Sequence, residues 1–219
     1  NLEHNRLDKI QRLRENGLEP YPTRSQRTHT SREAIHQFEQ IEQAAGQAAE
    51  PVGATARVTL AGRLRSIRPM GKITFAHIED GAGRIQILLR SDEVGKERLD
   101  LFNKEFDLGD FIQATGEIFR TRTGEVTLRA SDFVMLAKAI TPLPAAKDEI
   151  VGGMVVRHAT LSDTETRLRQ RYADLAINPD VRQIFRARSG IVRALRDFLD
   201  QRDFLEVETP VLQPIYGGA

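Results

Sequence analysis

The sequence predicts an α+β protein: a five-stranded β-barrel that follows N-terminal helices and precedes a second, mainly helical region. Between residues 56 and 138, apolar and polar residues alternate along several short segments, which is the period of half-buried strands. On either side of this region, apolar residues recur at helical spacing instead. We therefore expect four parts, at residues 1–55, 56–141, 142–161 and 162–219.

The N-terminal part predicts two helices and a linker. Apolar residues recur at three-residue steps over residues 6–16, and Gly17 offers the left-handed conformation that ends a helix. Thr30 and Glu33 have the spacing of a capping box in front of a second helix. Residues 43–54 are rich in small side chains, which favours a linker or the frayed end of that helix.

The central part predicts five strands in a fixed order. They are expected at residues 58–65, 72–78, 85–90, 110–120 and 125–130. One helical stretch, at residues 96–106, lies between the third and fourth strands. Three strands, a helix and two strands within about 80 residues is the order of an OB-fold barrel, which commonly binds oligonucleotides or sugars.

The C-terminal part predicts helices and one strand. After a proline-interrupted connector, one helix is expected from Asp163 to Leu175 and another, with a broad apolar stripe, from Val181 to Asp200. The apolar segment at residues 204–212 is expected to form a strand.

Composition excludes several classes of site. There is no cysteine, so disulfides and thiolate metal sites are excluded and a reducing cytoplasm is the expected compartment. The five histidines show no paired spacing, which argues against structural zinc. No segment approaches the roughly 18 apolar residues that span a bilayer. The net charge is only +1, so any nucleic-acid surface must come from a local arrangement.

The barrel sequence contains such an arrangement. Four basic residues fall within ten positions that hold no acid: Arg63, Arg65, Arg68 and Lys72. Phe75 follows on the next strand, and Gln86 and Glu125 lie on the polar registers of the third and fifth strands. Cations that meet phosphates, a ring that stacks on a base, and amide or carboxylate groups that read a base edge together predict a single-strand site.

Each of these residues also has a structural alternative. Phe75 shares a register with Ile73 and could belong to the core. The arginines could form an ordinary solvated face, while Gln86 and Glu125 could serve only to keep the barrel soluble.

The chain resembles the class II lysyl-tRNA synthetases. "RLRQRYADL" at residues 167–175 and "RDFLEVETPVLQPIYGGA" at residues 202–219 are similar to that family, and the latter matches its motif 1, with the obligatory proline at Pro210. Upstream, "AGRLRSIRPMGKITFAHIEDGAGRIQILL" resembles the family's anticodon-binding domain. The resemblance covers nearly the whole chain and favours lysine over the related aspartate and asparagine enzymes.

The resemblance implies a role for each barrel residue. Phe75 is similar to the aromatic residue that stacks on the central uridine of the anticodon. Arg68 and Gln86 match the groups that hydrogen-bond that base, and Glu125 matches a carboxylate that reads a neighbouring base. Salt-sensitive phosphate contacts are expected from Arg63, Arg65 and Lys72.

In this family, motif 1 builds a dimer interface, and Phe204, Val207 and Pro210 are the residues expected there. Gly217 resembles a residue that lines the amino-acid pocket, but with the rest of that pocket missing from the sequence a plain turn glycine is the favoured interpretation. Asp203 stands where the family usually has glycine; a left-handed helix stop at aspartate is possible but costs about 1 kcal/mol more than at glycine, so the turn geometry here is left open.

The resemblance implies the N-terminal portion of an enzyme that attaches lysine to tRNA(Lys) with ATP and Mg²⁺, as a cytoplasmic homodimer. The arginines of motifs 2 and 3, which hold ATP in that family, are not identifiable before Ala219. This chain alone is therefore expected to be inactive, with no catalytic residue, metal or cofactor of its own. Two alternatives stay open: a stand-alone, non-catalytic tRNA-binding protein derived from a synthetase, and an aspartyl- or asparaginyl-type relative.

Overall fold

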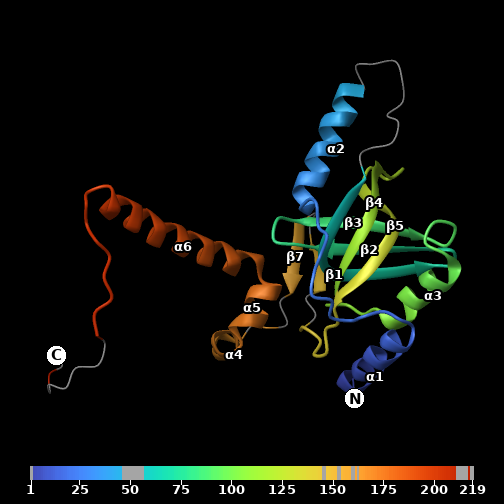
Figure 1. Ribbon diagram of the computed structural model, residues 1–219, viewed down its shortest axis with the longest axis horizontal. Coiled ribbons are helices and arrows are strands. Elements are labelled where there is room, and N and C mark those ends of the chain that lie inside the picture. Colours follow the sequence, from blue (N-terminus) through green and yellow to red (C-terminus); the bar gives the residue numbers. More distant parts are fainter. Residues whose placement is uncertain are drawn as a thin grey trace. The chain divides into compact units, whose positions relative to one another are not determined.

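A computed structural model describes residues 2–45, 57–144, 147–151, 154–158, 161, 163–210 and 217 (Figure 1). The chain divides into two compact units, Asn1–Pro142 and Leu143–Ala219. Within the described ranges, none of the helices is both long enough and apolar enough to cross a membrane.

The first unit is a barrel with three helices. Its elements are α1 (Leu2–Glu15), α2 (Ser31–Ala45), β1 (Val58–Met70), β2 (Ile73–Glu79), β3 (Arg84–Arg90), α3 (Lys96–Glu105), β4 (Phe111–Arg120) and β5 (Val126–Ala137). The strands form a closed barrel in the order β1-β2-β3-β5-β4. β1 pairs antiparallel with both β2 and β4, and a parallel pairing of β3 with β5 completes the closure. The predicted element order and the five-stranded barrel are confirmed.

β1 bends where its pairing changes from β4, along residues 58–63, to β2, along residues 63–70. Its register to β2 shifts between Leu64 and Ser66, and such a bulge bends and twists a strand. β4 and β5 also come unusually close, because a Cβ at Gly116 would overlap the carbonyl oxygen of Arg129. Only glycine fits at that crossing.

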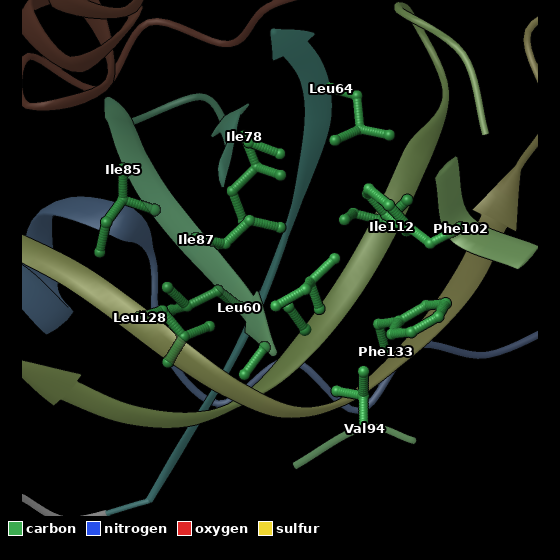
Figure 2. Packing of buried hydrophobic residues seen from close by; sticks show 14 of the residues in the cluster. Leu60, Leu64, Ile78, Ile85, Ile87, Val94, Phe102, Ile112, Leu128 and Phe133 are labelled. Atoms are coloured by element: carbon green, nitrogen blue, oxygen red, sulfur yellow. The ribbon is translucent and has the colours of Figure 1, made fainter. Parts of the chain in front are cut away.

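The barrel core is built from the inward registers of the strands (Figure 2). The fully buried side chains include Leu60, Leu64, Ile78, Ile85, Ile87, Ile112 and Leu128. Phe102 of α3 packs against Phe133 of β5, with ring centroids 5.2 Å apart and planes at 76°. This burial of apolar surface is the main favourable term in the fold, at about 25 cal/mol per Å². The side chains on the outward registers of the strands are not needed for this core and can form a polar surface.

α1 ends as its sequence predicts. Gly17 has φ 73°, and the amide of Leu18 donates to the carbonyl of Leu13 at 2.9 Å, which is the long bond of a Schellman cap. The helix is tied to the barrel by Arg6, which is buried and donates to the carbonyl of Ala139 at 2.7 Å.

α2 begins with the expected capping box. The amide of Glu33 donates to Thr30 Oγ1 at 3.2 Å, and the amide of Thr30 donates back to Glu33 Oε2 at 2.7 Å. In Figure 1, α2 and α1 lie at different ends of the barrel.

The β2–β3 turn adds a second cap to α2. The Asp80 carboxylate accepts from the amide and hydroxyl of Ser31 at 2.7 and 2.8 Å, and from the amides of Ala82 and Gly83, both at 2.8 Å. Burial alone would raise the pKa of Asp80, but these hydrogen bonds to the ionised form outweigh it and lower the pKa below its usual value. The ionised side chain therefore stabilises the folded state.

Asp80→Asn should lower the free energy of unfolding at neutral pH by about 1–3 kcal/mol, because the amide offers one acceptor oxygen where the carboxylate offers two. A folded-state pKa below the unfolded one gives stability that is present above the unfolded pKa and is lost as the pH falls through the folded pKa. Denaturant melts across pH should therefore show a shallower loss of stability below about pH 4 in the variant. Asp100→Asn, on the exposed side of α3, is the control, and equal acid profiles for Asp80→Asn and wild type would contradict the assignment.

The second unit begins with a hairpin. Its elements are β6 (Lys147–Val151), β7 (Met154–His158), α4 (Thr164–Arg169), α5 (Arg171–Ile177) and α6 (Pro179–Asp200). β6 and β7 pair antiparallel as a two-stranded sheet, within the range where the sequence suggested only a connector. Ile150 and Val151 in β6, with Val155 and Val156 in β7, favour this pairing.

The prediction of a single helix from Asp163 to Leu175 is wrong in one respect. The structure has two helices there, α4 and α5, which are separated at Gln170 with φ −105° and ψ 53°. Asp174, which is fully buried, accepts from Arg167 Nε at 3.0 Å and from Arg171 at 2.7 Å. This shared carboxylate joins α4 to α5 across the break.

The end of α6 is a Schellman cap built on an aspartate. Asp203 has φ 61°, so the helix does end in a left-handed stop at this aspartate, which settles the turn geometry that the sequence left open. The amide of Phe204 donates to the carbonyl of Leu199 at 3.2 Å, and that of Asp203 to Asp200 at 3.1 Å. The strand expected at residues 204–212 is not found at 204–210, where the described residues offer no pairing partner, while 211 and 212 lie outside the described ranges.

Candidate nucleic-acid interface

A groove of about 520 Å³ lies on the outside of the barrel, over β1, β2, β3 and the turn between β4 and β5. Its lining residues are Arg68, Met70, Phe75, Gln86, Leu88, Phe119, Thr121, Arg122, Thr123 and Glu125. The four residues expected to read bases (Arg68, Phe75, Gln86 and Glu125) come from four different strands or turns and meet in this one groove.

Phe75 does not belong to the core. Its neighbours Thr74 and Ala76 are fully buried, while Phe75 is partly exposed and lies outside the buried hydrophobic cluster. In the strand register, it lies between Arg68 of β1 and Leu88 of β3. The alternation of the strand therefore presents the ring to the groove, with a guanidinium on one side and an apolar side chain on the other.

The polar floor of the groove is a hydrogen-bonded chain centred on Glu125. Gln86 Nε2 donates to Glu125 Oε2 at 2.7 Å, and Thr127 Oγ1 donates to Gln86 Oε1 at 2.9 Å. Gln86 is largely buried, whereas the side chain of Glu125 keeps 45% of its surface exposed. Both ends of the Gln86 amide are therefore fixed, and the carboxylate remains open to a ligand.

His77 is a site residue that the sequence analysis missed. Its Nε2 lies 2.8 Å from Glu125 Oε1, and its Nδ1 lies 2.8 Å from Ser66 Oγ. Burial lowers the pKa of His77, the hydrogen bond to Glu125 opposes that effect, and the positive charges of Arg84 and Arg68 add to the lowering. The net pKa is below the usual value, so the neutral ring predominates at neutral pH.

The turn between β4 and β5 sets the position of Glu125. The amide of Glu125 donates to Thr121 Oγ1 at 3.0 Å, and Gly124 has φ 87°, a conformation that favours glycine. Arg120 donates to the carbonyl of Gly124 at 2.8 Å and to Glu42 of α2 at 2.6 Å. Helix α2 thereby supports the groove wall from outside.

The expected phosphate-contacting residues lie elsewhere. Arg63 stacks over the Phe111 ring at 4.7 Å, and Arg65 pairs with Glu79 at 3.1 Å. Lys72 is exposed in the turn between β1 and β2. None of the three lines the groove, and their phosphate contacts stay a prediction. Two cations do line it, Arg68 and Arg122, and both are exposed.

The remaining expected residues are in the second unit. Phe204 and Val207 are 63% and 67% exposed, and Pro210 is exposed as well. Gly217 is exposed and belongs to no helix or strand. Across the described ranges, no group of three or more histidine, aspartate or glutamate side chains could hold a metal ion.

The groove has the chemistry of a base-binding site. It combines an aromatic platform with an amide and a carboxylate fixed beside it, and two guanidinium groups at its edge. Such a site can stack an unpaired base, hydrogen-bond its edge and attract the phosphates that flank it.

Comparison with known proteins agrees with this geometry. Residues 58–136 match the family model of an OB-fold nucleic acid binding domain, and residues 163–219 match that of the class II tRNA synthetases of the D, K and N group. The chain is 44% identical to a lysine–tRNA ligase of Pelotomaculum thermopropionicum, over 98% of this chain and 38% of the relative. It is 45% identical to a lysine–tRNA ligase of Roseiflexus castenholzii, over 100% of this chain and 40% of the relative. It is 43% identical to a lysine–tRNA ligase of Bacillus subtilis, over 98% of this chain and 40% of the relative.

The chain thus spans about two fifths of the length of the curated relatives it matches. The two family models agree with one another, since they place a nucleic-acid-binding barrel before a class II synthetase segment. Residues 58–136 therefore belong to the OB-fold nucleic acid binding domains and residues 163–219 to the class II tRNA synthetases of the D, K and N group, and the chain as a whole is similar to lysine–tRNA ligases.

Proposed function

We propose that the barrel binds the anticodon of tRNA(Lys) in the groove around Phe75. The observation that supports this most strongly is the convergence of Arg68, Phe75, Gln86 and Glu125, which come from separated parts of the sequence, on a single outer groove. In this proposal Phe75 stacks on the central uridine, Arg68 and Gln86 hydrogen-bond its edge, and Glu125 accepts from a neighbouring base. Arg63, Arg65 and Lys72 contact phosphates beyond the groove.

The complete protein, in this proposal, attaches lysine to tRNA(Lys) in the cytoplasm. The lysine carboxylate displaces pyrophosphate from ATP to give lysyl adenylate, a tRNA hydroxyl then takes the lysyl group and releases AMP, and Mg²⁺ would neutralise the charge of the phosphates. The exposed apolar residues Phe204 and Val207, with Pro210, form part of a homodimer interface. Gly217 belongs to the lysine pocket of the complete protein.

The proposal is tested by titrating the 219-residue chain with anticodon stem-loops that share one stem. A loop with three uridines at the anticodon should bind, and the affinity should fall as salt rises, because phosphate contacts release counterions. A loop carrying the aspartate anticodon should bind at least tenfold more weakly. Equal affinity for the two loops would contradict anticodon reading.

The same sample should fail to exchange pyrophosphate into ATP, because the chain covers only about two fifths of its relatives. A purified sample is compared with a full-length lysine–tRNA ligase in the same assay. Exchange above the background of a mock purification would contradict this part of the proposal.

A further inference from the structure

We propose that His77 is a positioning residue which, held by Ser66, fixes the Glu125 carboxylate in the orientation that reads a base. This inference rests on the proposed function, since it concerns the same groove. It adds two residues, Ser66 and His77, that do not line the groove themselves. They act from beneath it, through the carboxylate that does.

The hydrogen atoms in the two hydrogen bonds that link Ser66, His77 and Glu125 can be assigned from the chemistry of these groups. A carboxylate only accepts, so the hydrogen between His77 and Glu125 belongs to His77 Nε2, 2.8 Å from Glu125 Oε1. In the neutral ring, Nδ1 is then an acceptor, and the Ser66 hydroxyl donates to it across 2.8 Å. Ser66 thereby selects the tautomer that can hold Glu125.

The strand register makes this contact rigid. His77 pairs with Ser66 on β1 and with Gln86 on β3, so the ring is aligned between two neighbours. It is 8% exposed, and its hydrogen bond reaches across to Glu125, 48 residues away in sequence. The Gln86 amide grips the other carboxylate oxygen at 2.7 Å.

Glu125 is therefore held at both oxygens before any ligand arrives. Each carboxylate oxygen has a second lone pair, so the group can still accept one N–H from a base edge. A side chain that is already fixed loses little freedom on binding, and this preorganisation is what favours one base edge over another. Without His77, one of the two fixed oxygens is released.

The probe that isolates this effect is 3-methyluridine. It differs from uridine by a methyl group in place of the N3–H, so it cannot donate to a carboxylate. We define the discrimination ratio as the dissociation constant of a stem-loop with 3-methyluridine divided by that of the all-uridine stem-loop. The discrimination ratio is first measured at each anticodon position for the wild type and for Glu125→Gln. The position at which the two ratios differ most is then used for all other variants.

His77→Leu should lower the discrimination ratio about threefold to tenfold, because one hydrogen bond to a charged group is lost. His77→Gln places an amide N–H near the former Nε2 position and should restore most of the ratio. Ser66→Ala should lower it by a smaller factor in the same direction. His36→Ala, an exposed histidine of α2, is the control and should leave the ratio unchanged.

A double-mutant cycle completes the test. If His77 acts through Glu125, His77→Leu added to Glu125→Gln should change the ratio no further. A purely structural His77 would weaken both stem-loops equally and leave the ratio at its wild-type value, and that result would overturn the inference. If His77→Leu does not melt cooperatively, His77→Gln and Ser66→Ala decide the question. A wild-type discrimination ratio in Ser66→Ala, together with a discrimination ratio in His77→Gln that is not restored toward the wild-type value, overturns the inference.

Failure of this inference can be told from failure of the proposed function. If wild-type protein does not bind the all-uridine stem-loop, anticodon binding itself is wrong. If it binds and discriminates, but the His77 and Ser66 variants discriminate equally well, only the positioning role is wrong.

Discussion

Phe75→Ala should weaken binding of the three-uridine stem-loop by about 1–3 kcal/mol, which is roughly a 5-fold to 150-fold rise in the dissociation constant. The reason is that the partly exposed ring offers a stacking face in the groove and is not part of the buried cluster. For the same reason the melting temperature should change little. Fluorescence anisotropy with labelled RNA, together with a thermal melt, measures both quantities.

Two further substitutions at the same position separate stacking from simple contact. Phe75→Tyr keeps the aromatic face and should bind nearly as the wild type does, whereas Phe75→Leu keeps apolar volume without a ring and should resemble Phe75→Ala. Tyr172→Ala removes an exposed ring from the second unit and serves as the control. A fall in stability of several kcal/mol with Phe75→Ala, and wild-type affinity for RNA, would show that the ring is a packing residue.

The largest effect on stability is expected at Lys138. Its ammonium group is fully buried and donates to Asp110 at 2.7 Å, to Asp107 at 2.6 Å and to the carbonyl of Glu105 at 2.8 Å. Removing one partner of a buried ion pair leaves an uncompensated charge, so Lys138→Met should cost about 3–5 kcal/mol of unfolding free energy. Chemical denaturation followed by circular dichroism measures the loss.

Combining Lys138→Met with a substitution at Asp110 separates the effect of lost charge balance from the effect of lost packing. Asp110 also accepts from the amides of Asp107 and Ala139, at 2.8 and 2.9 Å, so Asp110→Asn keeps an acceptor while removing the charge. Combined with Lys138→Met, it should lose less stability than the sum of the two single changes. Lys104→Met, on the exposed side of α3, should be close to neutral. Additive losses in the double variant would indicate that the two groups are not coupled.

Much of the fold could be predicted because its signals are local. Alternation along β1, β3 and β5, the glycine at position 17 and the Thr30–Glu33 pair each act within a few residues, and all have their expected structures. The break at Gln170 could not be predicted in this way. It depends on the buried carboxylate of Asp174, and burial of a polar group is a property of the packed chain.

In the candidate site, too, the residues marked by local patterns could be predicted, whereas the contacts between distant parts of the sequence could not. Alternation on a strand was sufficient to place Phe75 and Gln86 on registers that could face outward, although it could not distinguish the groove from the core. The contact of His77 with Glu125 could not be predicted, because the two residues are 48 positions apart in the sequence. What sequence could have offered is the two-residue spacing from Phe75 to His77, which puts both on the same side of β2. The ion pair of Arg65 with Glu79 forms at the bulge of β1, since in the register Glu79 lies opposite Arg63.

Anticodon binding in the groove requires that a base stacks on the Phe75 ring, and intermolecular NMR contacts can detect that stacking. The chain holds ten phenylalanines, which are labelled at the ring carbons and assigned with Phe75→Leu. In the complex with the three-uridine stem-loop, the ring protons of Phe75 should show nuclear Overhauser effects to the H5 and H6 protons of one uracil. A saturated complex in which the Phe75 ring shows neither contacts to RNA nor a change in chemical shift would mean that no base stacks on Phe75.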